Sequence, residues 1–212
     1  MKKNVFTFLA CLLIANTINA QGTDSDSRDN IHIGIKAGAN YSNIYDSEGE
    51  EYEADGKIGF AGGLFLSLPL GKYVGIQPEV LFSQKGFKAT SSVLGSDVGL
   101  TRTTNYIDIP IFLAIKPSRM LTLLVGPQYS YLIKQKDVFT NPITNVEVTQ
   151  DFEADDIRKN TLCMVGGIDI TLSSIVIGAR VGMDLYNNNG DGTSTTPRYK
   201  NAWAQATVGF RF

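Results

Sequence analysis

Apolar and polar residues alternate along most of the chain after about residue 30. In the first such segment, apolar side chains hold the odd positions from Ile31 to Tyr41, while small or polar residues such as Lys36 and Asn40 hold the even ones. A period of two predicts a β-strand with one apolar face. The same pattern covers residues 31–41, 58–68, 74–83, 106–115, 121–131, 162–172, 175–185 and 202–212. We therefore predict an all-β fold of eight antiparallel strands.

The connections between these segments alternate in length. Short links lie near residues 69–72, 116–119 and 172–175, whereas long polar links lie near residues 44–56, 87–103, 134–159 and 187–200. Three tight turns and both termini then fall at one end, and four long loops at the other. This asymmetry is typical of small outer-membrane barrels. We predict an up-and-down transmembrane β-barrel of OmpA or OmpX size, with four long outer loops and three short periplasmic turns.

A soluble eight-stranded barrel of lipocalin type is the alternative, because alternation alone does not say which face points outward. The less apolar face is rich in glycine, which suits a crowded interior. It also carries the charged residues Lys36, Glu79, Asp108, Arg180, Asp184 and Arg211. Tyr41, Tyr129 and Tyr131 lie on the apolar face near the loop end, where membrane proteins place interfacial aromatic side chains. Both observations favour the membrane barrel.

The first 20 residues form a separate segment. Lys2 and Lys3 precede an apolar run from Val5 to Ala15, and a small residue, Ala20, ends the segment. The run is shorter than the roughly 20 residues that a spanning helix needs. We predict a secretory signal peptide over 1–20, a short, polar, disordered lead over 21–30, and a barrel domain over 31–212 in the bacterial outer membrane.

Removal of this signal makes the chain more acidic. Lys2 and Lys3 leave with it, so 17 basic residues face 21 acidic ones and the formal charge becomes −4. This balance argues against nucleic acid as a partner. Only Cys163 remains, so no intrachain disulfide is expected.

Several stretches resemble the PorT-like outer-membrane β-barrel family. They are Gly-Ile-Lys-Ala-Gly-Ala-Asn-Tyr-Ser (34–42), Gly-Ile-Gln-Pro-Glu-Val-Leu-Phe-Ser-Gln-Lys-Gly (75–86), Tyr-Ile-Asp-Ile-Pro-Ile-Phe-Leu (106–113), Gly-Pro-Gln-Tyr-Ser-Tyr-Leu (126–132) and Val-Gly-Phe-Arg-Phe (208–212). Family members commonly carry Glu where Asp108 stands, so the charge is kept. The resemblance implies an eight-stranded barrel, and one branch of the family supports protein secretion across the outer membrane.

Glu79, Asp108 and Arg180 are the most prominent polar set, because all three are predicted to point inward near the middle of a strand. They could relay protons or ions through the lumen, or form a structural network of ion pairs. Eight strands leave an interior just wide enough for side chains. We therefore predict a lumen charge network that fills the barrel.

No residue pattern predicts catalysis, a cofactor or a metal. His32 is the only histidine and lies near the turn end. The acidic residues of loops 44–56 and 134–159 could contact divalent cations, but solvated loop surface is the preferred interpretation. The Asn-Asn-Asn-Gly-Asp-Gly run at 187–192 lacks the EF-hand spacing and its terminal Glu. We predict a protein that is not an enzyme. It contacts outer-membrane lipid and has a structural or interaction role with an unassigned envelope partner. A narrow porin-like channel and an accessory factor of secretion are the alternatives.

Overall fold

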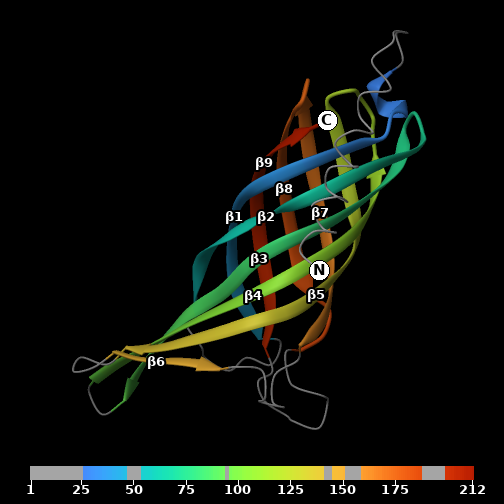
Figure 1. Ribbon diagram of the computed structural model, residues 1–212. Coiled ribbons are helices and arrows are strands. Elements are labelled where there is room, and N and C mark those ends of the chain that lie inside the picture. The colour runs from blue at the N-terminus through green and yellow to red at the C-terminus, as the bar shows by residue number, and fades with distance from the viewer. Residues whose placement is uncertain (1–25, 47–53, 94–95, 141–144, 151–158, 188–198) are drawn as a thin grey trace, which may run out of the picture.

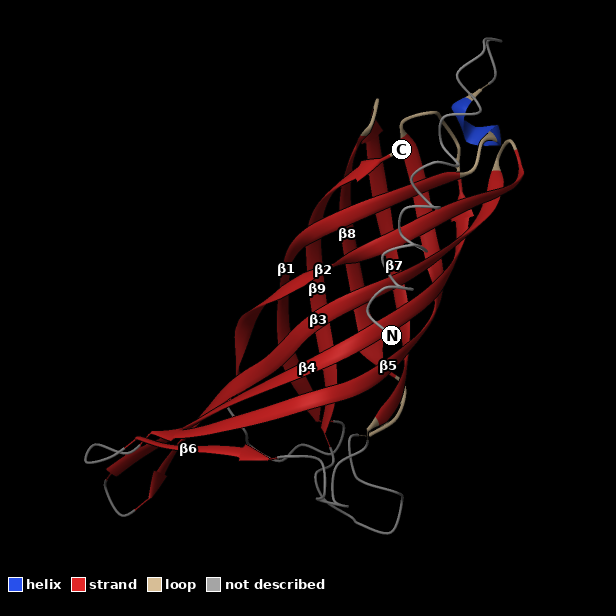
Figure 2. Cartoon of the chain, viewed as in Figure 1, coloured by secondary structure: helices blue, strands red, loops and turns tan. Residues whose placement is uncertain are grey.

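The computed structural model describes residues 26–46, 54–93, 96–140, 145–150, 159–187 and 199–212. Almost all of these residues lie in strands, apart from the turns and one short 3-10 helix, η2 (Ser27–Asp29) (Figure 2). The strands are β1 (His32–Asp46), β2 (Ala54–Gly71), β3 (Val74–Val93), β4 (Ser96–Ile115), β5 (Leu121–Thr140), β6 (Asn145–Gln150), β7 (Asn160–Leu172), β8 (Ile175–Asp184) and β9 (Tyr199–Arg211). None of the described residues forms a helix long and apolar enough to cross a membrane.

Eight of these strands close into one antiparallel barrel (Figure 1). Each strand pairs with its neighbours in sequence, except that β5 pairs with β7, and β1 pairs with β9 to close the ring. The predicted eight-stranded up-and-down barrel is confirmed. Tight turns at 72–73, 116–120 and 173–174 join strands at one end, which we call the turn end, and the long connections lie at the opposite loop end.

Two connections predicted as long loops are largely strand. The prediction for residues 87–103 was wrong, because β3 and β4 stay paired until Val93 faces Ser96. The prediction for residues 134–159 was wrong at its start, where β5 continues to Thr140 and β6 pairs with it. These extensions run past the rim of the barrel toward the lower left of Figure 1. Beyond the rim neither face of a strand has to be apolar, so the extensions carry no apolar alternation.

A β-bulge explains why the pattern stops early on β5. Tyr106 pairs with Leu132 and Asn105 pairs with Lys134, so Ile133 has no partner of its own on β4. One extra residue reverses which face the following side chains take. Even-numbered residues from Leu124 to Leu132 are buried, and beyond the bulge the buried residues are the odd-numbered Gln135 and Asp137.

The distribution of buried side chains decides between the membrane and the soluble barrel. Among the described residues, 13 buried side chains are hydrophobic and 23 are polar or charged, the reverse of a soluble core. On β7 and β8 the apolar side chains alternate outward, and outward residues such as Ile58 (72% exposed) and Val181 (63% exposed) have no protein cover. An apolar exterior around a polar interior is the arrangement of a barrel surrounded by lipid.

The lead before β1 was expected to be disordered throughout, and this is wrong from Asp26 onward. There the chain forms η2 and lies against the turn end of the barrel (Figure 1). Asp26 caps the short helix, since its carboxylate accepts a hydrogen bond from the backbone N–H of Arg28 at 3.2 Å. Residues 1–25 lie outside the described part of the chain.

Candidate functional site

The lumen contains two groups of buried ion pairs. The turn-side layer consists of Lys36, Gln77, Glu79, Asp169 and Arg180, and the loop-side layer of Lys85, Asp108, Cys163, Asp184 and Trp203. All ten side chains are buried. Alternation on each strand places them inward, and their distances from the strand ends place the two layers at different heights in the barrel.

Arg180 is the centre of the turn-side layer. Its guanidinium donates two parallel hydrogen bonds to Asp169, Nη1 to Oδ1 at 2.8 Å and Nη2 to Oδ2 at 3.0 Å. Its Nη2 also lies 3.5 Å from Oε1 of Glu79, whose other oxygen forms an ion pair with Lys36. Gln77 donates to Glu79 at 2.9 Å and to Asp169 at 3.2 Å. Two cations therefore balance two carboxylates, as burial without water requires.

The loop-side layer is built around Lys85. Its Nζ lies 3.1 Å from Oδ2 of Asp108 and 3.7 Å from the ring centroid of Trp203, with Tyr106 on another side at 5.0 Å. An ammonium between a carboxylate and two aromatic faces is held by charge and by cation–π attraction together. The Lys85 and Asp108 side chains are each only 1% exposed, so this pair is shielded from solvent inside the lumen.

Asp184 closes the same layer from β8. Its Oδ1 accepts from the Cys163 thiol at 3.1 Å, and its Oδ2 accepts from the backbone and side-chain amides of Asn201 at 3.0 and 2.7 Å. The Cys163 sulfur also lies 3.4 Å from the hydroxyl of Ser130. The thiol is thus packed as a polar member of the lumen.

The structure distributes the three predicted lumen residues over both layers. Glu79 and Arg180 meet in the turn-side layer. Asp108 lies in the loop-side layer and pairs with Lys85. The three predicted residues are therefore part of a larger set of buried ion pairs, which also contains Lys36, Lys85 and Asp169.

The alternating pattern could have identified the ion-pair partners that were not predicted, namely Lys36, Asp169 and Lys85. Lys36 and Asp169 stand on the inward face of their predicted segments and had no assigned contact. Lys85 lies two residues beyond the predicted end of its strand at 83, and continuing the inward odd positions of β3 would have included it. The sequence thus predicts which side chains point into the lumen, but it does not predict which of them contact each other.

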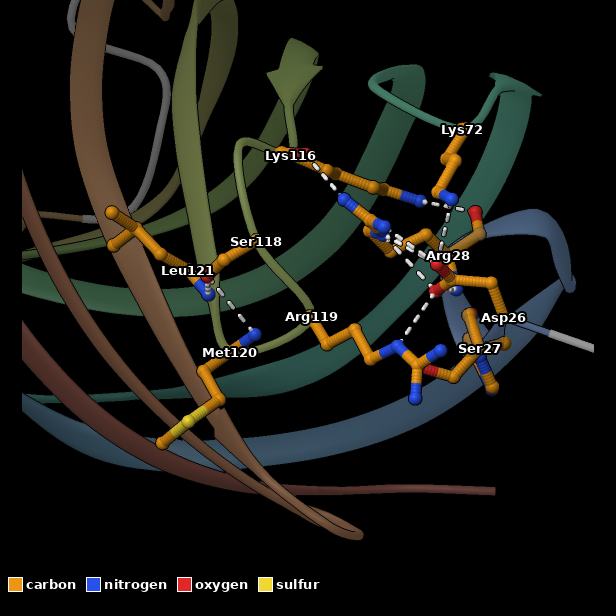
Figure 3. A network of polar contacts seen from close by, with 10 residues as sticks. Asp26, Ser27, Arg28, Lys72, Lys116, Ser118, Arg119, Met120 and Leu121 are labelled. Atoms are coloured by element: carbon orange, nitrogen blue, oxygen red, sulfur yellow. Dashed lines mark hydrogen bonds and ion pairs between the residues drawn. The ribbon is translucent and has the colours of Figure 1, made fainter.

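A second polar cluster lies at the turn end, where three basic side chains converge on Asp26 (Figure 3). Arg28 binds the carboxylate through Nε and Nη2. Lys72, in the turn between β2 and β3, lies 3.5 Å from Oδ2, and Arg119, in the turn between β4 and β5, lies 3.5 Å from Oδ1. We call these four residues the turn-end cluster.

Further contacts hold the short helix against the barrel. Arg28 lies over the ring of Tyr73 at 5.1 Å and donates to the carbonyl of Lys116 at 3.5 Å. The Lys116 ammonium in turn donates to Ser67 at 3.2 Å and to the carbonyl of Arg28 at 3.4 Å. A small cavity behind the helix has Ser27, Lys116 and Arg211 among its lining residues.

Contacts at the turn end shift the pKa values of Asp26, Arg28 and Lys116. Hydrogen bonds from Arg28 hold the pKa of Asp26 well below its ordinary value of 3.8, and Asp26 raises the pKa of Arg28 in return. Burial lowers the pKa of Lys116, and the nearby Arg211 lowers it further. Like charges are therefore crowded at this end.

The remaining candidates have simple environments or lie outside the described residues. The two ring nitrogens of His32 contact the backbone oxygens of Phe212 at 3.1 Å and Ser27 at 2.9 Å. In the described part of the chain, no group of three or more His, Cys, Asp or Glu side chains could hold a metal ion. Residues 47–53, 151–158 and 188–198, with most of the acidic loop positions, are not described.

Comparison with protein families finds one match. The family described as "Outer membrane protein beta-barrel domain" matches residues 19–190 of this chain. Among curated proteins, no relative matches.

Solved structures with a similar fold are small bacterial barrels. Ail, the attachment invasion locus protein of Yersinia pestis, solved with the heparin analogue sucrose octasulfate, is 14% identical with a TM-score of 0.50, and the alignment covers 86% of this chain and 99% of Ail. Neisserial surface protein A is 11% identical with a TM-score of 0.47, covering 85% of this chain and 97% of that protein. OprG from Pseudomonas aeruginosa is 12% identical with a TM-score of 0.38, covering 85% and 95%. At these identities the likeness concerns the fold.

Proposed function

Because this chain belongs to the outer membrane protein β-barrel domain family, and so resides in the bacterial outer membrane, we propose that it is a non-enzymatic barrel with a structural or interaction role. The observation that carries this proposal is the filled lumen. Both layers of ion pairs lie across the interior, and the Lys85–Asp108 and Arg180–Glu79 side chains are at most 2% exposed. Open pores are a property of wider barrels of 16 or more strands.

The interaction role is supported by the sheet that projects from the loop end. β3, β4 and β5 continue past the rim, and β6 adds to the outer edge of β5 (Figure 1). Among the described strands, none pairs with the other side of β6, so its backbone groups face outward from the sheet. An unpaired edge is a surface to which a partner can add a strand. We expect a protein partner from the cell envelope or its surroundings at this sheet.

The sequence motifs quoted above support a finer assignment, a place in the PorT-like family. A role as accessory factor in secretion across the outer membrane belongs to one branch of that family, and the resemblance extends this possibility to the present chain.

Conductance across a planar lipid bilayer tests the filled lumen. The purified barrel should give no steady channels under voltages at which an open porin, added to the same bilayer, conducts. Steady, reproducible unit currents would contradict the proposal and support the narrow channel.

Site-specific crosslinking in intact cells tests the interaction role. A photo-crosslinking residue in place of Lys88 on β3, or of Lys136 on β5, should give a discrete protein adduct that mass spectrometry can identify. The same residue in place of Met120 at the turn end is the control. Equal adduct patterns from both ends, or none from the projecting sheet, would count against a partner at the loop end.

A further inference from the structure

The turn end of the barrel is basic although the protein as a whole is acidic. The described segments at this end are residues 26–31, 72–73, 116–120, 173–174 and 211–212, and they contain five basic side chains and two acidic ones. The full chain has a formal charge of −2. The short turns of such barrels face the periplasm, so the basic patch lies at the inner surface of the outer membrane.

Two of these cations are exposed to solvent. The side chains of Lys72 and Arg119 are 47% and 71% exposed, and they come from different turns. Both nevertheless point to the same place, the carboxylate of Asp26, and each contacts a different oxygen. Figure 3 shows the two side chains approaching Asp26 from opposite sides. The pair therefore forms a clamp for an anionic group with two oxygens, and Asp26 is the anion that now occupies it.

The two turns that carry Lys72 and Arg119 also carry exposed apolar side chains. Tyr73 follows Lys72 in its turn, Met120 follows Arg119, and Leu70 lies just before the first turn; all three are more than half exposed. A backbone hydrogen bond of 2.8 Å from Lys116 to Tyr73 connects the two turns directly. Basic residues beside exposed aromatic and aliphatic ones are typical of the level of lipid headgroups, where charge meets phosphate and apolar groups meet the acyl chains.

We propose that Lys72 and Arg119 bind the phosphate of an anionic phospholipid in the periplasmic leaflet, and that Asp26 occupies this site when no lipid is bound. The headgroup phosphate replaces the carboxylate between the two side chains, and the acyl chains lie along Tyr73, Met120 and Leu70. The contacts of Lys72 and Arg119 with Asp26 are long, at 3.5 Å, and both cations are exposed, so these two contacts are weak and can be exchanged for contacts with a phosphate, while Arg28 keeps its hydrogen bonds to Asp26. The proposal rests on the outer-membrane location and not on the interaction role, so either can fail alone.

Lipid binding measured by native mass spectrometry tests this site. The full barrel is titrated with phosphatidylglycerol, with phosphatidylcholine and with inorganic phosphate. The wild-type protein should bind phosphatidylglycerol more tightly than phosphatidylcholine. Each basic residue near a membrane contributes about 1 kcal/mol, or about fivefold in affinity. The double variant K72Q/R119Q should therefore bind phosphatidylglycerol about 25-fold more weakly, with phosphatidylcholine binding unchanged.

Two further variants separate the lipid site from general electrostatics and from a structural staple. The matched control K88Q/K134Q removes two exposed lysines at the loop end and should leave phosphatidylglycerol binding unchanged. Asp26→Asn removes the competing carboxylate and should strengthen phosphatidylglycerol binding about fivefold, by the same charge contribution. If the double variant folds poorly, the single variant R119Q should still show about a fivefold loss.

Several results would overturn the proposal. These are equal binding of the two lipids by the wild-type barrel, a double variant within twofold of wild type, or an equal loss in the loop-end control. Weaker phosphatidylglycerol binding by Asp26→Asn would assign this residue to holding the helix in place. Inorganic phosphate that binds as tightly as phosphatidylglycerol would assign the clamp to a soluble anion.

Discussion

Arg180→Met is expected to destabilise the barrel strongly, because it leaves two carboxylates in the turn-side layer with only one cation. The methionine fills much of the same volume, so the main loss is electrostatic. Arg180 donates to Asp169 at 2.8 and 3.0 Å and lies 3.5 Å from Glu79. Two charged hydrogen bonds contribute about 1.5–3 kcal/mol each. Breaking one partner of a buried ion pair costs about 3–5 kcal/mol, so we expect a loss in that range.

A second substitution tests whether the cause is the unbalanced charge. Adding Asp169→Asn to Arg180→Met leaves one ion pair, Lys36 with Glu79, and should recover most of the lost stability.

Arg102→Met is the matched control at the loop end. It breaks a bidentate pair with Asp137 at 2.8 and 2.7 Å, but the Arg102 side chain is 17% exposed. Asp137 is buried while Arg102 covers it, but removing this partly exposed side chain lets water reach the remaining carboxylate, so the loss should be smaller than for Arg180→Met.

The assay is equilibrium unfolding in lipid vesicles with denaturant, together with the shift between folded and heated forms on a gel. The free energy of unfolding should fall in the order wild type, double variant, Arg180→Met. If Arg180→Met unfolds within about 1 kcal/mol of wild type, or if the double variant is less stable than the single one, the buried charge balance does not stabilise this barrel.

Three other perturbations probe other parts of the chain. Because the pKa of Asp26 is lowered in the folded protein, its contact stabilises the short helix fully above the ordinary pKa of 3.8. This stabilisation decreases below pH 3.8 and is lost as the pH falls through the lowered pKa of the folded state. The fluorescence of a dye on a Ser27→Cys variant should report this release at acid pH, and the added change Asp26→Asn should abolish the transition. Gly86→Ala should lower the free energy of unfolding in denaturant by about 1–3 kcal/mol. At Gly86 φ is +152°, and an added Cβ would lie 2.1 Å from a backbone oxygen of β4. Gly71→Ala is the control and should lower it little, because no atom lies within 4 Å of an added Cβ there. Cys163, which is 0% exposed, should react with a maleimide only after denaturation, as located by mass spectrometry of the labelled peptides. A fully labelled native barrel would show that the lumen is open to solvent.

The barrel strands could be predicted where lipid surrounds them. There the outward side chains must be apolar while the inward ones pack against each other, and this difference produces the period of two. The predicted ends at 83 and 131 came too early because outward side chains beyond them, such as Gln84 and Lys134, are no longer apolar, although Lys85 and Gln135 still face inward and are buried. On β5 the bulge at Ile133 adds a second reason, since the inward phase changes there.

The lumen side chains were predictable as a set but not as pairs. Glu79 and Arg180 are 101 positions apart in sequence, and Arg180 meets Asp169 from the neighbouring strand. Their contact depends on barrel closure and on the register of every strand between them. Asp108 shows the consequence, because its partner Lys85 lies on the adjacent strand beyond the predicted strand end. The turn-end cluster depends in a similar way on two turns and a leading segment that the pairing of β1 to β5 brings together.

The sequence by itself determined the number of barrel strands, the face that each side chain takes within the predicted segments and the end at which the tight turns lie. These properties are local, since each follows from the pleat of one strand and the length of one connection. The tertiary structure decided which charges pair, how far the sheet projects and what the segment before β1 contacts. These properties depend on the stagger between the strands that close the ring, and the residue pattern of a single strand does not determine that stagger.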